Sequence, residues 1–363
     1  MTLIFSNHRF QYEVERLFRN FINEPGIKLS TDKADAQGDF CLTEKVEYPG
    51  GAELSVDLVR EGKRFCMSRS IPSGMPEKEQ ERELCILLYK ALREYTGRDL
   101  PWGILTGVRP VKVLSKLTDA QAFQSLLVSP RKLAVSRRIE QVQKPLADSI
   151  PENSFSLYVS IPFCPTRCSY CSFVSHSVNS AAARLDEYLG RMMEEMRQLS
   201  TISRHLGLVP DTIYFGGGTP TVLSAEQLKM LFSALECFDL SHIREFTVEA
   251  GRPDTITPEK LEAIKAAGVG RISVNPQTMN DKTLRAVGRK HTVEDIRRVF
   301  REAREEGHQN INMDLILGLP GEDAADVRNT MEEIMKLAPD NVTVHTLAVK
   351  RASRLREELA QHD

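Results

Sequence analysis

The sequence has no long hydrophobic run and no excess of charge of either sign. No apolar stretch approaches the ~18 residues of a membrane-spanning helix. The apolar run at the N-terminus is too short for a signal peptide. Lys and Arg number 48 and Asp and Glu number 50, so no global basic field indicates a nucleic-acid partner. These absences predict a cytoplasmic protein with no transmembrane segment and no nucleic-acid partner.

Cysteine is also scarce, with seven residues among 363, yet three of them are clustered. Cys164, Cys168 and Cys171 form the pattern Cys-x3-Cys-x2-Cys, and the next cysteine along the chain, Cys237, is far from them. In the cytosol, clustered thiols more often bind metal or react than form disulfides. The three cysteines of the N-terminal third are expected to be buried as small apolar residues: Cys41, Cys66 and Cys85.

The chain is long enough for about two domains, and the pattern of its first 150 residues differs from the rest. Residues 1–150 predict a smaller α+β domain that ends in a helical linker. Its expected elements are a helix near 10–21, paired strands at 54–59 and 64–69, and helices at 79–95 and 130–148. Two prolines and small polar residues place the linker at 145–154.

Residues 151–363 show a regular alternation of strand and helix patterns. The strand candidates are 155–161, 212–215, 245–250, 271–276, 311–317 and 341–347. The helix candidates are 181–202, 224–237, 258–267, 293–306 and 324–337, and Thr292 with Asp295 predicts an N-cap. This alternation predicts a parallel sheet with right-handed crossovers, open or partly closed into a barrel. In such sheets the chemistry gathers at the carboxyl ends of the strands.

The cysteine cluster follows the first strand of that sheet and allows several kinds of site. A structural zinc ion usually takes four protein ligands, whereas only three thiols are present on this loop. Three thiolates binding a [4Fe–4S] cluster would leave one iron open to a small molecule. A zinc site, a disulfide with a spare thiol, and chance clustering remain as alternatives.

The same cysteine pattern, with Tyr170 inside it, resembles the signature of radical S-adenosylmethionine (SAM) enzymes. Five further motifs follow in the order used by one branch, the oxygen-independent coproporphyrinogen III oxidases and the related haem chaperones. They lie at Gly216–Thr221, Val248–Ala250, Arg271–Gln277, Gly288–His291 and Asp314–Gly321. Six ordered motifs together are specific, although each alone is weak. The resemblance covers about residues 154–348 and is closest to coproporphyrinogen dehydrogenases of the HemZ type.

This resemblance implies an α/β fold, a radical SAM partial (β/α)6 barrel over residues 151–363. It also implies two cofactors, a [4Fe–4S] cluster held by the three cysteines and SAM on the open iron. It assigns Gly217, Gly218 and Thr219 to the methionine end of SAM and Arg289 to its carboxylate. It places Tyr158 and Tyr170 around the ligand and the cluster. It assigns Glu249, Gln277 and Asp314 to the ribose hydroxyls of SAM. No catalytic residue is assigned from the resemblance.

The resemblance further implies an oxidoreductase that decarboxylates coproporphyrinogen III to protoporphyrinogen IX in haem biosynthesis. Its expected partners are a tetrapyrrole and a low-potential electron donor such as flavodoxin or ferredoxin. The alternative function is a haem-binding chaperone that keeps the cluster and does not turn over coproporphyrinogen.

Two of the departures from the branch bear on the structure. Pro276 lacks an amide hydrogen, so the strand that contains it is expected to end or bulge there. The chain stops at Asp363, one helix after the last barrel strand, so the family's C-terminal domain is expected to be missing.

Overall fold

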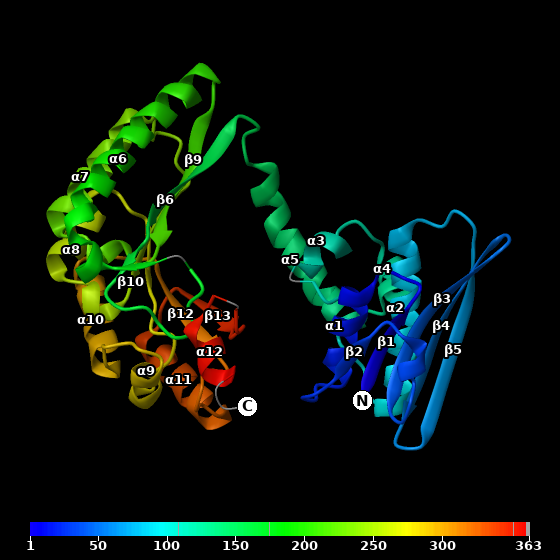
Figure 1. Ribbon diagram of the computed structural model, residues 1–363. Coiled ribbons are helices and arrows are strands. Elements are labelled where there is room, and N and C mark those ends of the chain that lie inside the picture. Colours follow the sequence, from blue (N-terminus) through cyan, green and yellow to red (C-terminus); the bar gives the residue numbers. More distant parts are fainter. Residues whose placement is uncertain (108, 174, 351, 361–363) are drawn as a thin grey trace. The chain divides into compact units, whose positions relative to one another are not determined.

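The computed structural model describes residues 1–107, 109–173, 175–350 and 352–360 (Figure 1). The chain divides into two compact units, Met1–Ser149 and Ile150–Asp363, each with its own hydrophobic core. Among the described residues, no helix combines the length and the apolar character that crossing a membrane requires. Each unit is described separately.

The N-terminal unit is a five-stranded sheet covered by helices, which confirms the predicted α+β domain. The strand order is β2-β1-β3-β4-β5; β1 is parallel to both neighbours, and β3, β4 and β5 form an antiparallel meander. Alternate residues of β4 pack with α1 and α2 in one core. Its elements are β1 (Thr2–Ser6), α1 (Gln11–Phe21), β2 (Lys28–Ser30), β3 (Phe40–Tyr48), β4 (Gly51–Arg60), β5 (Lys63–Pro72), α2 (Glu77–Thr96), α3 (Pro110–Leu114), α4 (Asp119–Leu126) and α5 (Pro130–Asp148).

One expectation for this unit was wrong, the burial of Cys66, whereas the helix predicted at 130–148 is confirmed as α5. Pro145 lies inside α5, so the non-helical part of the predicted linker is shorter than 145–154. A proline removes one helical hydrogen bond, and here the helix continues in spite of that loss. Cys66 is exposed on β5, because that strand is the edge of the sheet and alternate side chains point to solvent. Cys41 and Cys85 are buried, as predicted.

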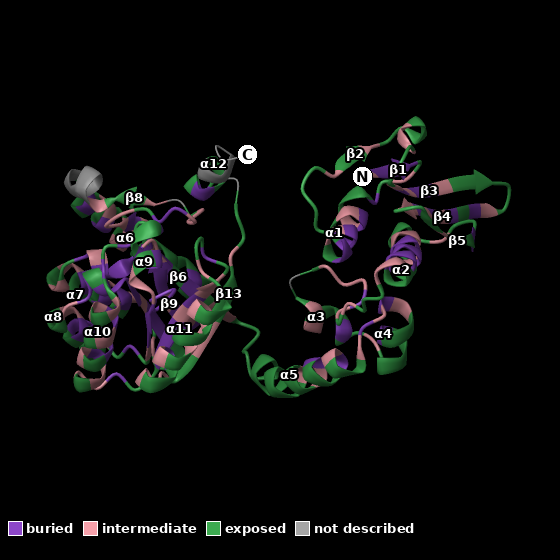
Figure 2. Cartoon of the chain, turned by 90° about the horizontal axis from the view of Figure 1, so that it is seen from below, coloured by how far each residue is buried: buried purple, intermediate pink, exposed green. Residues whose placement is uncertain are grey.

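The second unit is built on a six-stranded parallel sheet of order β13-β12-β11-β10-β9-β6. Its helices lie along one face of the sheet (Figure 1), and the strand residues on that face are buried (Figure 2). This arrangement confirms the predicted α/β partial barrel. Its main elements are β6 (Ser154–Ile161), α6 (Val178–His205), β9 (Val209–Gly217), α7 (Ala225–Ala234), β10 (Glu245–Gly251), α8 (Pro258–Ala266), β11 (Arg271–Val274), α9 (Asp281–Ala286), α10 (Val293–Glu305), β12 (Ile311–Leu317), α11 (Ala324–Leu337), β13 (Asn341–Thr346) and α12 (Arg354–Ala360).

The strand β11 ends before the proline, as the missing amide predicts. Its last residue is Val274, two residues before Pro276. Gln277 then adopts a φ of 71°, a left-handed conformation that is uncommon outside glycine. Its amide donates to the Asp314 carbonyl at 2.9 Å, and its carbonyl accepts from the Ile316 amide at 2.9 Å. These two bonds fasten Gln277 beside β12, at the carboxyl end of the sheet.

Candidate active site

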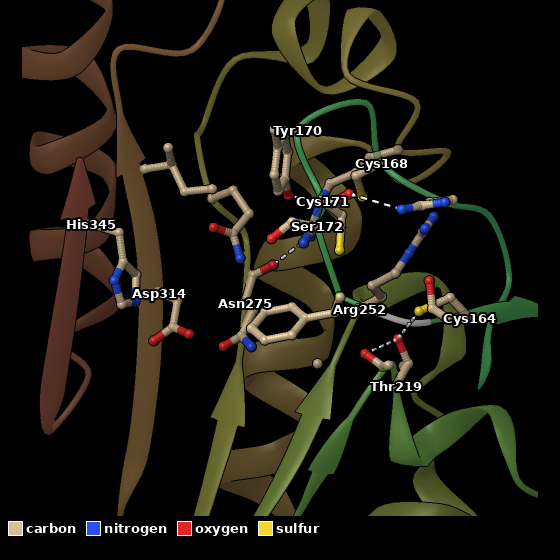
Figure 3. Close-up of a pocket in the computed structure, with 18 of the residues that line it drawn as sticks. Cys164, Cys168, Tyr170, Cys171, Ser172, Thr219, Arg252, Asn275, Asp314 and His345 are labelled. Atoms are coloured by element: carbon tan, nitrogen blue, oxygen red, sulfur yellow. Dashed lines mark hydrogen bonds between the residues drawn. The ribbon is translucent and has the colours of Figure 1, made fainter. Parts of the chain in front are cut away.

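A cavity of about 400 Å³ opens at the carboxyl ends of the parallel strands, and all three clustered cysteines line it (Figure 3). The loop that carries them follows β6 and starts with the short strand β7 (Phe163–Cys164), which pairs with β8 (His176–Ser177). Cys168 is buried, and Cys164 and Cys171 are half-buried. The volume lies within the range of small-molecule sites, roughly 300–1,000 Å³.

Contacts from three separate segments hold the cysteine loop. The Nη1 atom of Arg252 donates to both the carbonyl and the hydroxyl oxygen of Thr166, at 3.0 and 2.8 Å. The Thr166 hydroxyl donates to the Gly288 carbonyl at 2.9 Å. The Leu355 amide donates to the Ser169 carbonyl at 2.9 Å. The loop is therefore fastened independently of any ligand.

Arg252 belongs to a buried network that the sequence reasoning missed. Its guanidinium pairs with both carboxylate oxygens of Asp254, at 3.0 and 2.8 Å, and His291 Nδ1 lies 3.3 Å from the same carboxylate. Burial opposes ionisation of Asp254, but hydrogen bonds from His291 and Arg252 outweigh it and hold its pKa well below the usual range. Burial lowers the pKa of His291, and Asp254 offsets part of that effect. The sequence signals are the Arg-Pro-Asp segment directly after β10 and His291 at the end of the Gly288–His291 motif.

Glycines allow the turn after β9 to lie against the cysteine loop. Gly217 has a φ of 109°. A Cβ on Gly218 would lie 2.6 Å from the Phe163 carbonyl oxygen and 2.9 Å from Cys164 Sγ, closer than real Cβ atoms approach. Thr219 Oγ1 lies 3.4 Å from that sulfur. Only glycine fits at position 218, and backbone groups there are open to a ligand in the cavity.

Arg289 is a buried cation without a carboxylate partner among the described residues. It is 7% exposed, and its guanidinium donates to the Asn275 carbonyl at 2.6 Å and to the Tyr170 hydroxyl at 3.2 Å. Burial raises the pKa of Tyr170, so its phenol is neutral and supplies no countercharge. A buried guanidinium without a counter-ion is costly. The cavity that Arg289 lines is therefore suited to an anionic ligand group.

The predicted carboxylates and amide lie around the same cavity. Glu249 accepts a 2.5 Å hydrogen bond from the Tyr214 hydroxyl, and burial raises its pKa even though that bond lowers it. Asp314 accepts from Asn312 Nδ2 at 2.7 Å and is half-buried. Asp314 and Gln277 both line the cavity, and Asp314 faces inward from β12 (Figure 3).

Tyr158 is the one predicted site residue that does not line this cavity. It is 58% exposed, and its ring stacks on that of Tyr214 with centroids 5.7 Å apart. It therefore contacts the residue that binds Glu249 but stays outside the cavity itself. Conversely, the sequence reasoning did not select several cavity residues: Arg167, Ser172, Arg252, Asn275, His345 and Lys350. Asn275, His345 and Lys350 all follow or end barrel strands, which is the signal that could have found them.

The thiols fit an iron–sulfur cluster better than a single metal ion. In the described part of the chain, no group of three or more His, Cys, Asp or Glu side chains is arranged to hold one ion. A [4Fe–4S] cluster instead binds each thiolate to a different iron, so its ligands need not converge. Burial raises the pKa of Cys164 and Cys171 in the free protein, so binding of iron must release their protons.

Comparison with known proteins agrees with this geometry. Residues 158–334 match the family described as the Radical SAM superfamily. The chain therefore contains a radical SAM domain. Members of the superfamily use a [4Fe–4S] cluster and SAM, which are the two cofactors that the resemblance implied.

The individual relatives belong to the branch that the motifs indicated. The chain is 40% identical over 294 residues to the oxygen-independent coproporphyrinogen-III oxidase-like protein HemZ of Bacillus subtilis, covering 77% of this chain and 58% of HemZ. It is 39% identical over 197 residues to the heme chaperone HemW of the same organism, covering 54% and 51%. The matched parts thus span little more than half of these relatives.

One solved structure supports the fold and the branch. Coproporphyrinogen III oxidase HemN from Escherichia coli, a radical SAM enzyme, superposes with a TM-score of 0.50 at 28% sequence identity. The match covers 61% of this chain and 55% of HemN.

Proposed function

We propose that this chain is a radical SAM oxidoreductase that converts propionate side chains of coproporphyrinogen III to vinyl groups in haem biosynthesis. The observation that carries the proposal is that Arg289, buried without a carboxylate partner among the described residues, lines the same cavity as the three clustered thiols. An anionic cofactor beside an iron–sulfur cluster satisfies both features. The substrate rests on the names of HemZ and HemN.

In this proposal the chain's residues hold and orient two cofactors. Cys164, Cys168 and Cys171 would hold the cluster, which together with SAM supplies a 5′-deoxyadenosyl radical that takes a hydrogen atom from the substrate. Arg289 would pair with the SAM carboxylate in a bidentate contact that a lysine could not reproduce. Gly217, Gly218 and Thr219 would face the methionine end.

The other assigned residues would hold the nucleoside. Glu249, Gln277 and Asp314 line the cavity, and their side-chain oxygens would accept hydrogen bonds from the ribose hydroxyls. Tyr170 supports Arg289 directly. Tyr158, outside the cavity, would act through its stacking on Tyr214.

The cavity also offers positive charge for substrate carboxylates. Arg167 and Lys350 line it in addition to Arg289 and Arg252. Arg167 and Lys350 form no ion pair with a carboxylate in the described part of the chain. Propionates carry negative charge at neutral pH, so these two cations are suited to bind them. This charge supports a multiply carboxylated substrate but does not distinguish one tetrapyrrole from another.

The deciding experiment measures 5′-deoxyadenosine. The protein would be purified without oxygen, reconstituted with iron and sulfide, reduced with dithionite, and supplied with SAM and coproporphyrinogen III. We expect 5′-deoxyadenosine and protoporphyrinogen IX from the wild type and neither from Cys168→Ala. A reduced, iron-loaded wild type that forms no 5′-deoxyadenosine would contradict the proposal.

A haem chaperone is the second candidate, because the chain is 39% identical to a relative named heme chaperone HemW. This function predicts stoichiometric haem binding and no decarboxylation of coproporphyrinogen III. Haem titration followed by absorbance, on the same reconstituted protein, separates the two functions.

A further inference from the structure

Beside the cysteine loop lies a second cavity, of about 540 Å³, with a strongly cationic lining. Five of its described lining residues carry a positive charge and none carries a carboxylate. The cations are Arg167, Arg285, Arg289, Lys290 and Arg354. Because the net charge of the whole chain is −2, this cationic cavity is a local accumulation and does not reflect a basic protein.

The cations of this cavity are not neutralised by carboxylates of the described residues. Arg167 Nη2 donates to the Ala352 carbonyl at 2.8 Å, and Arg354 donates to the Arg167 carbonyl. Arg285 and Lys290 are exposed and form no ion pair with a described residue. Cations elsewhere on this unit behave differently, since many form ion pairs with nearby carboxylates. The cationic cavity therefore attracts an anionic partner.

The cationic cavity lies beside the cysteine loop, and this position indicates what kind of partner would bind there. Arg167 lies between Cys164 and Cys168 in sequence, yet no cysteine lines the cationic cavity. The two cavities share Thr166, Arg167 and Arg289, so they adjoin at the loop that carries the thiols. Arg285, Lys290 and Arg354 line the cationic cavity alone. A partner that contacts the exposed Arg285 and Lys290 would lie next to the cluster loop, and neither residue lines the cysteine-lined cavity, where SAM and substrate would bind.

We infer that the cationic cavity is the docking site of a small acidic protein that carries a low-potential one-electron centre and reduces the cluster. The inference rests on the proposed function, since only a redox-active cluster needs this partner. In each encounter the donor loses one electron and the cluster gains it. Complexes of this kind bury little surface, below about 1,200 Å². Their association rate depends on complementary charge, which the exposed Arg285 and Lys290 provide.

The test compares two double variants with equal loss of charge. Arg285→Gln/Lys290→Gln removes two cations of the cavity. Lys229→Gln/Lys282→Gln removes two exposed lysines outside it, one of them on the same helix as Arg285. The rate of 5′-deoxyadenosine formation is measured with limiting reduced flavodoxin, with limiting reduced ferredoxin, and with dithionite, which needs no docking surface.

We expect the cavity variant to lose about tenfold in the rate driven by its preferred protein donor at low ionic strength. Its rate should also depend less on salt than that of the wild type. The dithionite-driven rate should be equal in all three proteins, and the control variant should match the wild type with every reductant.

Four results would overturn the docking site. They are an unchanged protein-driven rate in the cavity variant, an equal loss in the control variant, failure of both protein donors with the wild type, or a raised KM for coproporphyrinogen under dithionite. The last would show that the cavity holds substrate carboxylates. Failure of the wild type with dithionite would instead overturn the proposed function, so the two failures are distinguishable.

Discussion

The side chain that distinguishes this site most clearly is Arg289. Its guanidinium is buried and donates hydrogen bonds to the Asn275 carbonyl and to the neutral phenol of Tyr170. Arg289 also lines the cavity, where a ligand can contact it. An arginine retained under these conditions indicates an external anion, because burial without a counter-ion is otherwise unfavourable.

Replacement of Arg289 by lysine should therefore weaken SAM binding while the cluster still loads. Lysine keeps the charge but cannot make the two bonds to Asn275 and Tyr170 together with a bidentate contact to a carboxylate. Loss of one charge-assisted contact costs about 1.5–3 kcal/mol, which is about a ten- to hundredfold rise in Kd. Isothermal titration of the reconstituted, unreduced protein with SAM measures this change. An unchanged Kd would show that Arg289 has only a structural role.

The glycine at position 218 makes a separate prediction about cluster assembly. In Gly218→Ala the added Cβ meets the Phe163 carbonyl and Cys164 Sγ, so the loop must shift at its first cysteine. We expect the variant to bind less than half the iron of the wild type after reconstitution, with a thermal stability close to normal. Gly190→Ala is the matched control, because its Cβ meets nothing within 4 Å and a helical alanine is favoured over glycine. Equal iron content in both variants would contradict the prediction.

At the scale of elements, the cysteine loop depends on the segments that follow β10 and α9. Thr166 connects them, since its hydroxyl accepts from Arg252 and donates to the Gly288 carbonyl. Thr166→Val keeps the shape of the side chain and removes both hydrogen bonds. We expect iron to be lost to a chelator several-fold faster than from the wild type, with no change in far-UV circular dichroism.

Thr201→Val is the control for this variant. The Thr201 hydroxyl donates within its own helix to the Arg197 carbonyl and does not contact the cysteine loop. Chelator kinetics that match the wild type are expected there. If both threonine variants lost iron at the same rate, the Thr166 bonds would not be what holds the loop.

The elements themselves were largely predictable, because their signals are local. In the sequence, the strands of the parallel sheet are short runs of apolar residues. Thr292 and Asp295 form the predicted capping box at the start of α10. Pro276 correctly indicated the end of β11. These features depend on residues within a few positions of one another.

The network around Arg252 could not be predicted in the same way. Asp254 and His291 are 37 positions apart, and they meet only because two connections at the carboxyl end of the sheet come together. The exposure of Tyr158 was likewise not predictable, since the alternation of a strand gives the face of a side chain but not its depth along the barrel. Tertiary packing decides both.

For the whole molecule, the separate cores of the two units make thermal unfolding informative. The core of the N-terminal unit and that of the barrel share no residue. We expect two thermal transitions in calorimetry of the reconstituted protein. SAM should raise the midpoint temperature of only one of them. At a SAM concentration of 100 times Kd the stabilisation is about 2.7 kcal/mol. A single transition, or an equal shift of both, would show that the units unfold together.

The barrel should also lose stability in mild acid. His291 and His308 are buried, and burial lowers the pKa of each despite the partial compensation by Asp254 and by the Leu261 carbonyl. Both folded values lie below the ordinary value of about 6.5, so below that pH the unfolded chain takes up protons that the folded barrel excludes. Their contribution to stability is complete above pH 6.5 and is lost as the pH falls toward the folded values.

Chemical denaturation of the barrel between pH 8 and pH 5.5 measures this dependence. Charges facing His308 include Lys265, and those facing His291 are Arg252, Asp254 and Arg289. His308→Gln keeps a donor for the Leu261 carbonyl but cannot titrate, so its stability should fall less with acid than that of the wild type. His242→Gln, at an exposed position, should follow the wild-type curve. If His308→Gln gave the same slope as the wild type, the acid sensitivity would arise from groups other than this buried imidazole.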